Sequence, residues 1–392
     1  MNSVREFLHS PPPIALVMAV AGFAALPPNI MPVLSRLLAE THHLNDAELG
    51  YFIASGTTAG LLASLTAPFW INKVRSGLIV AAAFMVYAIA SHGLYVVSGH
   101  TMLYTLQFLL NGSIVVIASV CSAVFLRAPN PARIMSIKIS NDVIIASCFL
   151  YVLPIDTLGL EGIVTSISVV FVVAALLSLR WPATYQHVQP RALDMDGISH
   201  GARQGWYVLI TLTVFYAAGV SAWNYLGRLA SAAGLSNDEG ASAIAVGLFI
   251  GVFGALSAAW LTGRARGLML PVISGVIFVL SIASLGVVKG YVPFLIASIV
   301  FNVSWNLFIP FLMALLPRSD FSGRLSSLLP ATAMAGGIFG PPLTGNLILW
   351  SGYDVALIAT AALAATSIVA FAYLSKSITK SMTKSIPEIL PR

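Results

Sequence analysis

The chain of 392 residues has little charge, since Lys, Arg, Asp and Glu together make up only 9% of it. Soluble domains carry about 25% charged residues, so this composition excludes an ordinary soluble fold. Hydrophobic residues make up 58%, and the mean hydropathy is +0.90. The apolar stretches approach or exceed the ~20 residues that a helix needs to cross a membrane, and they lack the alternating pattern of a membrane β-barrel. The composition indicates an all-α integral membrane protein.

Cysteine is also scarce, and the usual groupings of catalytic residues are missing from the apolar stretches. The two cysteines, Cys121 and Cys148, have a spacing that indicates neither a disulfide nor a metal site. No paired carboxylates, no cluster of metal ligands and no nucleophile with a base occur there. We therefore expect no enzyme activity, no cofactor and no metal. A sensor is disfavoured because no stretch is long enough for a soluble output domain.

Twelve apolar spans are predicted, separated mostly by loops shorter than a dozen residues. The spans cover residues 12–34, 48–71, 77–97, 101–126, 134–155, 160–180, 206–228, 240–262, 268–288, 291–316, 325–349 and 353–374. The polar stretch between the sixth and seventh spans divides them into two groups of six. The predicted organisation is a six-helix bundle at 1–180, a cytoplasmic linker at 181–205, a second six-helix bundle at 206–376 and a basic cytoplasmic tail at 377–392.

The positions of Lys and Arg predict the orientation in the membrane. With the N-terminus inside, most of the 20 basic residues fall in cytoplasmic segments, as the positive-inside rule requires. We expect a multi-pass protein of the cell inner (cytoplasmic) membrane with both termini cytoplasmic. The net charge of +6 then reflects topology and does not predict nucleic-acid binding. Lys376, Lys380 and Lys384 follow one another at helical spacing, which predicts contact of the tail with anionic membrane lipids. Arg228, at the outer end of its span, is interpreted as a surface charge.

The two halves contain similar motifs. The second span opens with LNDAELG from Leu44 and the eighth with LSNDEG from Leu235, both polar clusters typical of helix starts. The basic pairs that follow these spans are 191 residues apart (264 − 73 = 191). Small residues that allow close helix packing recur on both spans. These are Gly50, Gly56 and Gly60 in the second span and Gly247, Gly251 and Gly254 in the eighth.

This organisation resembles the major facilitator superfamily over essentially the whole chain. The segment from Pro68 to Gly77 is similar to the family's loop signature, with Asn72 where the family has aspartate. Gly336 to Gly345 resembles the glycine-proline bend of the family's eleventh span. The fifth span lacks the family's antiporter signature, and Gln107 stands where many exporters carry arginine. The resemblance implies two pseudo-symmetric six-helix bundles and a central cavity lined by the first, fourth, seventh and tenth spans. It implies gating roles for Lys73, Arg75, Arg264, Arg266, Gly340 and Pro341.

Polar residues on the spans that would line this cavity are the candidates for substrate binding. An unpaired amide in hydrocarbon costs several kcal/mol, so such side chains should face a cavity or each other. The alternative is interhelical hydrogen bonding worth ~0.6 to 2 kcal/mol. Since 302 − 111 = 191, the two amide pairs are predicted to occupy equivalent positions. The candidates are Gln107 and Asn111, Asn302 and Asn306 with Trp305, and the weaker Asn29 and Trp223.

Asp142 is the one carboxylate that lies away from the ends of the predicted spans, and Lys138 lies one helical turn before it. A rise of ~1.5 Å per residue from Arg133 puts Asp142 near the middle of the ~30 Å core. A charge there costs at least ~2.5 to 3.5 kcal/mol, so it must pair, face water or be neutral. One interpretation is proton coupling, because separating Asp142 from Lys138 would change whether the carboxyl holds a proton. The other is a permanent structural ion pair.

A cavity lined by amides and aromatic residues, with few fixed charges, suits a small neutral or amphipathic organic molecule better than a phosphate or dicarboxylate. The chain is most similar to drug and metabolite antiporters of the major facilitator superfamily, which implies proton-coupled efflux. Uptake of a small organic nutrient by proton symport is the alternative, and a lipid flippase or scramblase is the alternative of another class. The expected partners are a small-molecule substrate, protons and membrane lipids, and we expect a monomer.

Overall fold

The computed structural model describes residues 14–71, 73–125, 131–181, 200–261, 268–319, 325 and 328–385, and this part of the chain is helical throughout, without strands. In chain order the helices are α2 (Ile14–Ala24), α3 (Leu26–His42), α4 (Asp46–Trp70), α5 (Ser76–Ser91), α6 (Gly93–Val96), α7 (His100–Phe125), α8 (Pro131–Val152), α9 (Ile155–Ser178), α10 (His200–Ala232), α11 (Asn237–Leu261), α12 (Met269–Leu285), α13 (Tyr291–Met313), α14 (Leu315–Ser319) and α15 (Leu329–Ser385).

Nine helical stretches in the described part are long and apolar enough to cross a membrane, which confirms a multi-pass helical membrane protein. Each predicted span overlaps a helix, while the number of crossings stays a prediction. Two predicted spans fall on the single helix α15, which is interrupted by the non-helical Gly352 (φ 81°, ψ 173°). Glycine adopts this positive φ without the steric cost of a Cβ. The predicted fifth span lies on α8, which is not among the nine and contains Arg133, Lys138 and Asp142.

Three helices continue past the limits of the predicted spans into polar stretches. The first span was expected to end at residue 34, but α3 continues to His42 because Ser35 and Arg36 are buried against the C-terminal half. The seventh was expected to begin at 206, within a linker reaching 205, but α10 begins at His200. At the other end, α15 runs on to Ser385 through most of the predicted tail.

Two helices of corresponding position begin with the same hydrogen-bonded cap. At the start of α4, the Asn45 side chain accepts from Glu48 N and the Glu48 carboxylate accepts from Asn45 N, both at 2.9 Å. At the start of α11, Ser236 Oγ accepts from Glu239 N at 3.1 Å and Glu239 Oε2 accepts from Ser236 N at 3.0 Å. Such reciprocal caps satisfy amide groups that the first helical turn leaves free. The caps are 191 residues apart (236 − 45 = 191), in agreement with the repeat in the sequence.

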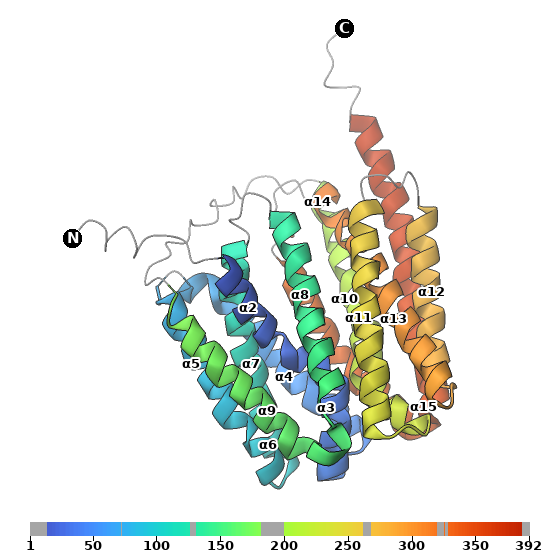
Figure 1. The fold of residues 1–392 in the computed structure, drawn as a ribbon. Helices are drawn as coiled ribbons and strands as arrows, with labels where there is room; N and C mark the ends of the chain where they lie inside the picture. Colours follow the sequence, from blue (N-terminus) through green and yellow to red (C-terminus); the bar gives the residue numbers. More distant parts are fainter. Residues whose placement is uncertain are drawn as a thin grey trace, which may run out of the picture.

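The helices that precede residue 182 contact those that follow residue 199 along three seams. α4 packs on α15, α8 packs on α11, and α3 packs on α10. In Figure 1, α5, α7 and α9 lie to one side of these seams and α12 and α13 to the other. The turns from α8 to α9 and from α10 to α11 lie at the same end of the molecule, the lower end in this view. The seams bring residues of both sequence halves around one interior space.

Candidate functional site

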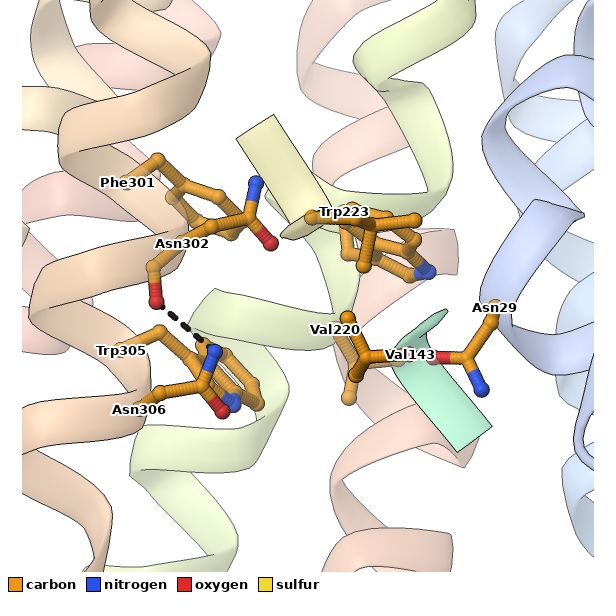
Figure 2. A pocket seen from close by; sticks show the side chains of 9 residues that line it. Asn29, Val143, Val220, Trp223, Phe301, Asn302, Trp305 and Asn306 are labelled. Atoms are coloured by element: carbon orange, nitrogen blue, oxygen red, sulfur yellow. Dashed lines mark hydrogen bonds between the residues drawn. The ribbon is translucent and has the colours of Figure 1, made fainter. Parts of the chain in front are cut away.

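A cavity of about 180 Å³ lies where α3, α8, α10, α11 and α13 meet (Figure 2). Both sequence halves contribute to it, because α3 and α8 precede residue 182 and the others follow residue 199. Binding pockets for drug-sized ligands usually span about 300 to 1,000 Å³, so this cavity suits a small molecule. It is lined by Asn29, Val143, Val220, Trp223, Leu248, Phe301, Asn302, Trp305 and Asn306. None of these side chains is ionisable.

The three asparagines of the cavity share one arrangement. Each side-chain nitrogen donates to the backbone carbonyl four residues earlier: Asn29 to Ala25 at 2.8 Å, Asn302 to Ser298 at 2.9 Å and Asn306 to Asn302 at 2.9 Å. A carbonyl only accepts, so these contacts fix which end of each amide is nitrogen. Figure 2 shows the amide oxygens of Asn29 and Asn302 turned toward the space between them, from opposite walls. In Asn29 and Asn302, a hydrogen bond to the helix therefore holds the amide nitrogen in place, and the amide oxygen faces the cavity.

Trp305 forms a rigid wall of the cavity. Its ring occupies the space that Gly219 of α10 leaves, and a Cβ at residue 219 would overlap the ring. Phe215 and Phe278 hold it from other sides, with ring centroids 5.3 and 5.5 Å away. Aromatic pairs at such distances add about 0.5 to 1.5 kcal/mol to the burial of their area. The indole is therefore fixed before any ligand binds.

Trp223 connects the two halves across the cavity. Its indole Nε1 donates to the carbonyl of Pro28, on α3, at 3.1 Å. This bond uses the ring's single donor, so the ring offers the cavity only its aromatic surface.

Gln107 and Asn111, on α7, do not line this cavity. They face α4, where a Cβ added to Gly56 would lie 2.9 Å from Gln107 Nε2 and 3.1 Å from Asn111 Cβ. In the second half, Gly247 of α11 faces Asn302 in the same way, with its added Cβ 3.2 Å from Asn302 Nδ2. In each half, a glycine-bearing face of one helix therefore packs on an amide-bearing face of another: α4 on α7, and α11 on α13.

The common offset shows how the two amide pairs correspond. Gly247 corresponds to Gly56 (247 − 56 = 191) and Asn302 to Asn111 (302 − 111 = 191). By the same offset Asn306 corresponds to Val115 (306 − 115 = 191). The expected equivalence therefore holds for Asn111 and Asn302 alone. The pair Asn302–Asn306 lies one helical turn further along its helix than the pair Gln107–Asn111 does along α7.

Lys138 and Asp142 form an ion pair on α8, with Lys138 Nζ 2.6 Å from Asp142 Oδ2. Asp142 is 5% exposed, and its Oδ1 is buried without a hydrogen-bond partner in the described part of the chain. Val143, the next residue, lines the cavity, and Asn141 Nδ2 donates to Met18 O of α2 at 3.1 Å. The pair therefore lies beside the cavity and not in its wall.

A cluster around Asp46 was missed in the sequence. The Asp46 carboxylate at the start of α4 accepts from Arg228 Nε of α10 at 3.1 Å and from the Tyr353 hydroxyl of α15 at 3.1 and 3.2 Å. The Tyr225 hydroxyl donates to the Asp46 carbonyl at 2.5 Å and to that of Pro341 at 3.1 Å. We call Asp46, Tyr225, Arg228 and Tyr353 the latch. Arg228 is thus a partner in an ion pair between halves, and its interpretation as a surface charge is wrong.

Two further contacts join the halves beside the latch. Arg36 of α3 donates through both terminal nitrogens to the carbonyls of Leu235 and Ser236, each at 3.1 Å. The Asp156 carboxylate accepts from the backbone N–H groups of Asn237 and Asp238 at 3.0 and 3.2 Å, and Asp238 Oδ1 accepts from Asp156 N at 3.0 Å. The starts of α9 and α11 therefore cap one another, at the end that holds the α8–α9 and α10–α11 turns (Figure 1).

The residues with expected gating roles fall in different places. Gly340 lies against α10, where a Cβ would come 2.7 Å from Ser221 Oγ. Pro341 contacts both Tyr225 and Gly50 of α4, so this bend belongs to the seam beside the latch. Lys73 and Arg75 are exposed. Arg264, Arg266 and Asn72 lie outside the described residues.

Comparisons with known proteins found solved structures with a similar fold. No family model and no curated protein matches the sequence. Among solved structures, the chain is similar to a bacterial homologue of the human lysosomal transporter Spinster in its inward-facing, unoccupied conformation, with a TM-score of 0.74 and 13% identity over 94% of this chain and 97% of that one. It is similar to the nucleoside transporter NupG, with a TM-score of 0.74 and 13% identity over 93% and 99%. At this identity the likeness shows the fold alone, which the chain shares with these two transporters.

Proposed function

We propose that the chain is a secondary active transporter that moves a small neutral or amphipathic organic molecule by alternating access. The observation that carries this proposal is the uncharged cavity between the two sequence halves, combined with the latch that ties those halves together at one end. In the proposed layout, twelve spans form two six-helix bundles, residues 1–180 and 206–376, in the inner membrane with both termini cytoplasmic. The two caps 191 residues apart and the break at Gly352 support it.

Alternating access requires that contacts between the halves form at one end of the cavity while the other end admits substrate. The latch, Arg36 and the Asp156–Asp238 caps are such contacts, and all lie toward one end. By the proposed orientation this is the outer end. The structure then corresponds to the state closed to the outside, and opening must break the Asp46–Arg228 ion pair.

For the direction we propose proton-coupled efflux, with Asp142 and Lys138 as the coupling pair. The support is the buried, unpartnered Oδ1, which can take a proton while Oδ2 still contacts Lys138. Protonation converts Lys138⁺–Asp142⁻ into Lys138⁺ with a neutral acid, and the partly buried cation, now without its counter-charge, favours another position of α8. One charge crossing 100 mV supplies ~2.3 kcal/mol, enough for more than a tenfold concentration ratio. A phospholipid headgroup is disfavoured as cargo because no Lys or Arg lines the cavity.

The test compares cells overproducing the protein with cells overproducing an Asn302→Leu variant at equal membrane abundance. We expect one or more small metabolites to fall inside the first cells and rise in the medium. A rise inside the cells would indicate uptake. Movement of fluorescent lipid in proteoliposomes, with no metabolite affected, would indicate a scramblase. No difference in any metabolite or lipid would overturn the proposal.

A further inference from the structure

We propose that the cavity selects a neutral, planar molecule with hydrogen-bond donors on two opposite edges. This inference rests on the proposed function and narrows its substrate to one chemical class. The ligand class includes flat heterocycles with ring N–H groups at opposite positions and aromatic 1,4-diols, and flat molecules that only accept hydrogen bonds should bind less tightly.

The first argument is the set of polar atoms that the protein leaves unpaired. The Oδ1 atoms of Asn29 and Asn302 form no hydrogen bond in the described part of the chain, whereas the nitrogen of each amide donates one of its two N–H groups to its own helix. The Trp223 N–H donates to Pro28. In Figure 2 the oxygens of Asn29 and Asn302 are turned toward the space between these two residues, and an amide oxygen needs a donor from the ligand.

The second argument is the shape and charge of the walls. Trp223, Phe301 and Trp305 present aromatic surfaces, and Trp305 is held in place by Gly219 and its ring neighbours. Planar rings gain the most from contact with such surfaces. An ionised ligand would lose its hydration without meeting an opposite charge, because the nine lining residues contain none.

The third argument is the position of the two acceptors. Asn29 belongs to α3 and Asn302 to α13, on opposite sides of the cavity (Figure 2). A ligand with one donor can hydrogen-bond to only one of these two asparagines, and therefore to only one sequence half. A ligand with donors on opposite edges bonds to both halves at once, so its binding energy acts on the relation between them, as alternating access requires.

The test uses matched pairs in which methylation removes the donors and leaves a flat neutral ring: hydroquinone against 1,4-dimethoxybenzene, and piperazine-2,5-dione against its 1,4-dimethyl derivative. Each compound is added to the purified full-length protein, and its Kd is taken from the shift in melting temperature. We expect donor-bearing members to bind at least tenfold more tightly than their methylated partners, because each lost donor leaves a desolvated carbonyl unpaired.

Three variants locate the effect. Asn29→Leu and Asn302→Leu, made separately, should each weaken binding of the donor-bearing members about tenfold and leave the methylated members unchanged. Asn346→Leu is the matched control, because Asn346 Nδ2 also donates to the carbonyl four residues earlier, at 2.7 Å to Pro342, but lies outside the cavity. Melting temperatures without ligand show whether each variant folds, and either cavity asparagine alone suffices for the test.

Equal binding within the pairs, equal loss in the Asn346→Leu control, or no binding by any donor-bearing member would overturn the inference. The cell assay separates this result from failure of the wider proposal. Metabolites that move but are charged or lack donors would contradict the substrate class and leave the transporter proposal standing. If nothing moves and nothing binds, the transporter proposal itself fails.

Discussion

The latch makes a quantitative prediction about opening of the cavity. Replacing Asp46 by Asn keeps the size of the side chain and removes its negative charge. The Asp46 and Arg228 side chains are only 12% and 24% exposed, so solvent compensates little of the loss. A hydrogen bond to a charged group contributes about 1.5 to 3 kcal/mol, against about 1 kcal/mol for a neutral one. Because Arg228 and Tyr353 both bond to this carboxylate, the closed state loses about 2 kcal/mol in total, which shifts the equilibrium toward opening about 30-fold.

Alkylation of a cysteine inside the cavity measures this opening. Val220 lines the cavity, and a Val220→Cys variant in a background lacking Cys121 and Cys148 provides a single reporter. A membrane-impermeant maleimide added from the latch side reaches residue 220 only when the latch is open. We expect Asp46→Asn to raise the alkylation rate by about 10- to 100-fold.

Two further variants test the cause of that change. In an Arg228→Gln background, Asp46→Asn should add little, because residues that act through one shared contact are not additive. Asp354→Asn removes a carboxylate that is exposed near the same end of the molecule and should leave the rate unchanged. An unchanged rate in Asp46→Asn, or fully additive effects of the two latch substitutions, would refute the assignment of the latch.

Three other predictions concern the ion pair, the aromatic wall and the reciprocal caps. Asp142→Asn should abolish substrate flux driven by an imposed pH gradient in proteoliposomes while leaving substrate binding within threefold; undiminished flux would identify the pair as structural. Gly219→Val should displace the Trp305 ring, lower stability by about 1 to 3 kcal/mol and weaken binding, whereas Gly112→Ala, whose Cβ would lie 3.5 Å from Ala59, should be neutral in the same thermal melts. Asp156→Ala removes the acceptor for two N–H groups at the start of α11 and should cost about 0.5 to 2 kcal/mol, which a melting curve against wild type detects.

The helices and part of the site could be predicted because they depend on local chemistry. An apolar run must become helix in a membrane, since no water is present to pair its backbone. The same rule requires Asn302 and Asn306 to find partners or a cavity, and they do both. The rule does not distinguish these residues from Asn111, which carries the same side chain. Asn111 does not line the cavity because α7 packs on α4 at Gly56. No local sequence pattern indicates this packing.

The latch could not be predicted, because its partners are far apart in the sequence. Asp46 and Arg228 are 182 residues apart, and Asp46 and Tyr353 are 307 residues apart. Each alone resembles an ordinary residue at a membrane surface. The one available signal was the polar cluster that opens the second span, which predicted a helix start and gave no indication of a partner for Asp46.

The internal repeat provides a symmetric frame, and the ionisable candidate residues lie where that symmetry is broken. The caps and the glycine faces recur at an offset of 191, but Asp46 corresponds to Asn237 (46 + 191 = 237) and cannot have a second ion pair in its counterpart. By the same offset Asp142 corresponds to Ala333 (142 + 191 = 333). A symmetric frame gives two similar ways for the halves to close on each other. Because the ionisable residues occur in only one copy, a proton or a substrate has different interactions in the two states, and only such a difference can shift their populations.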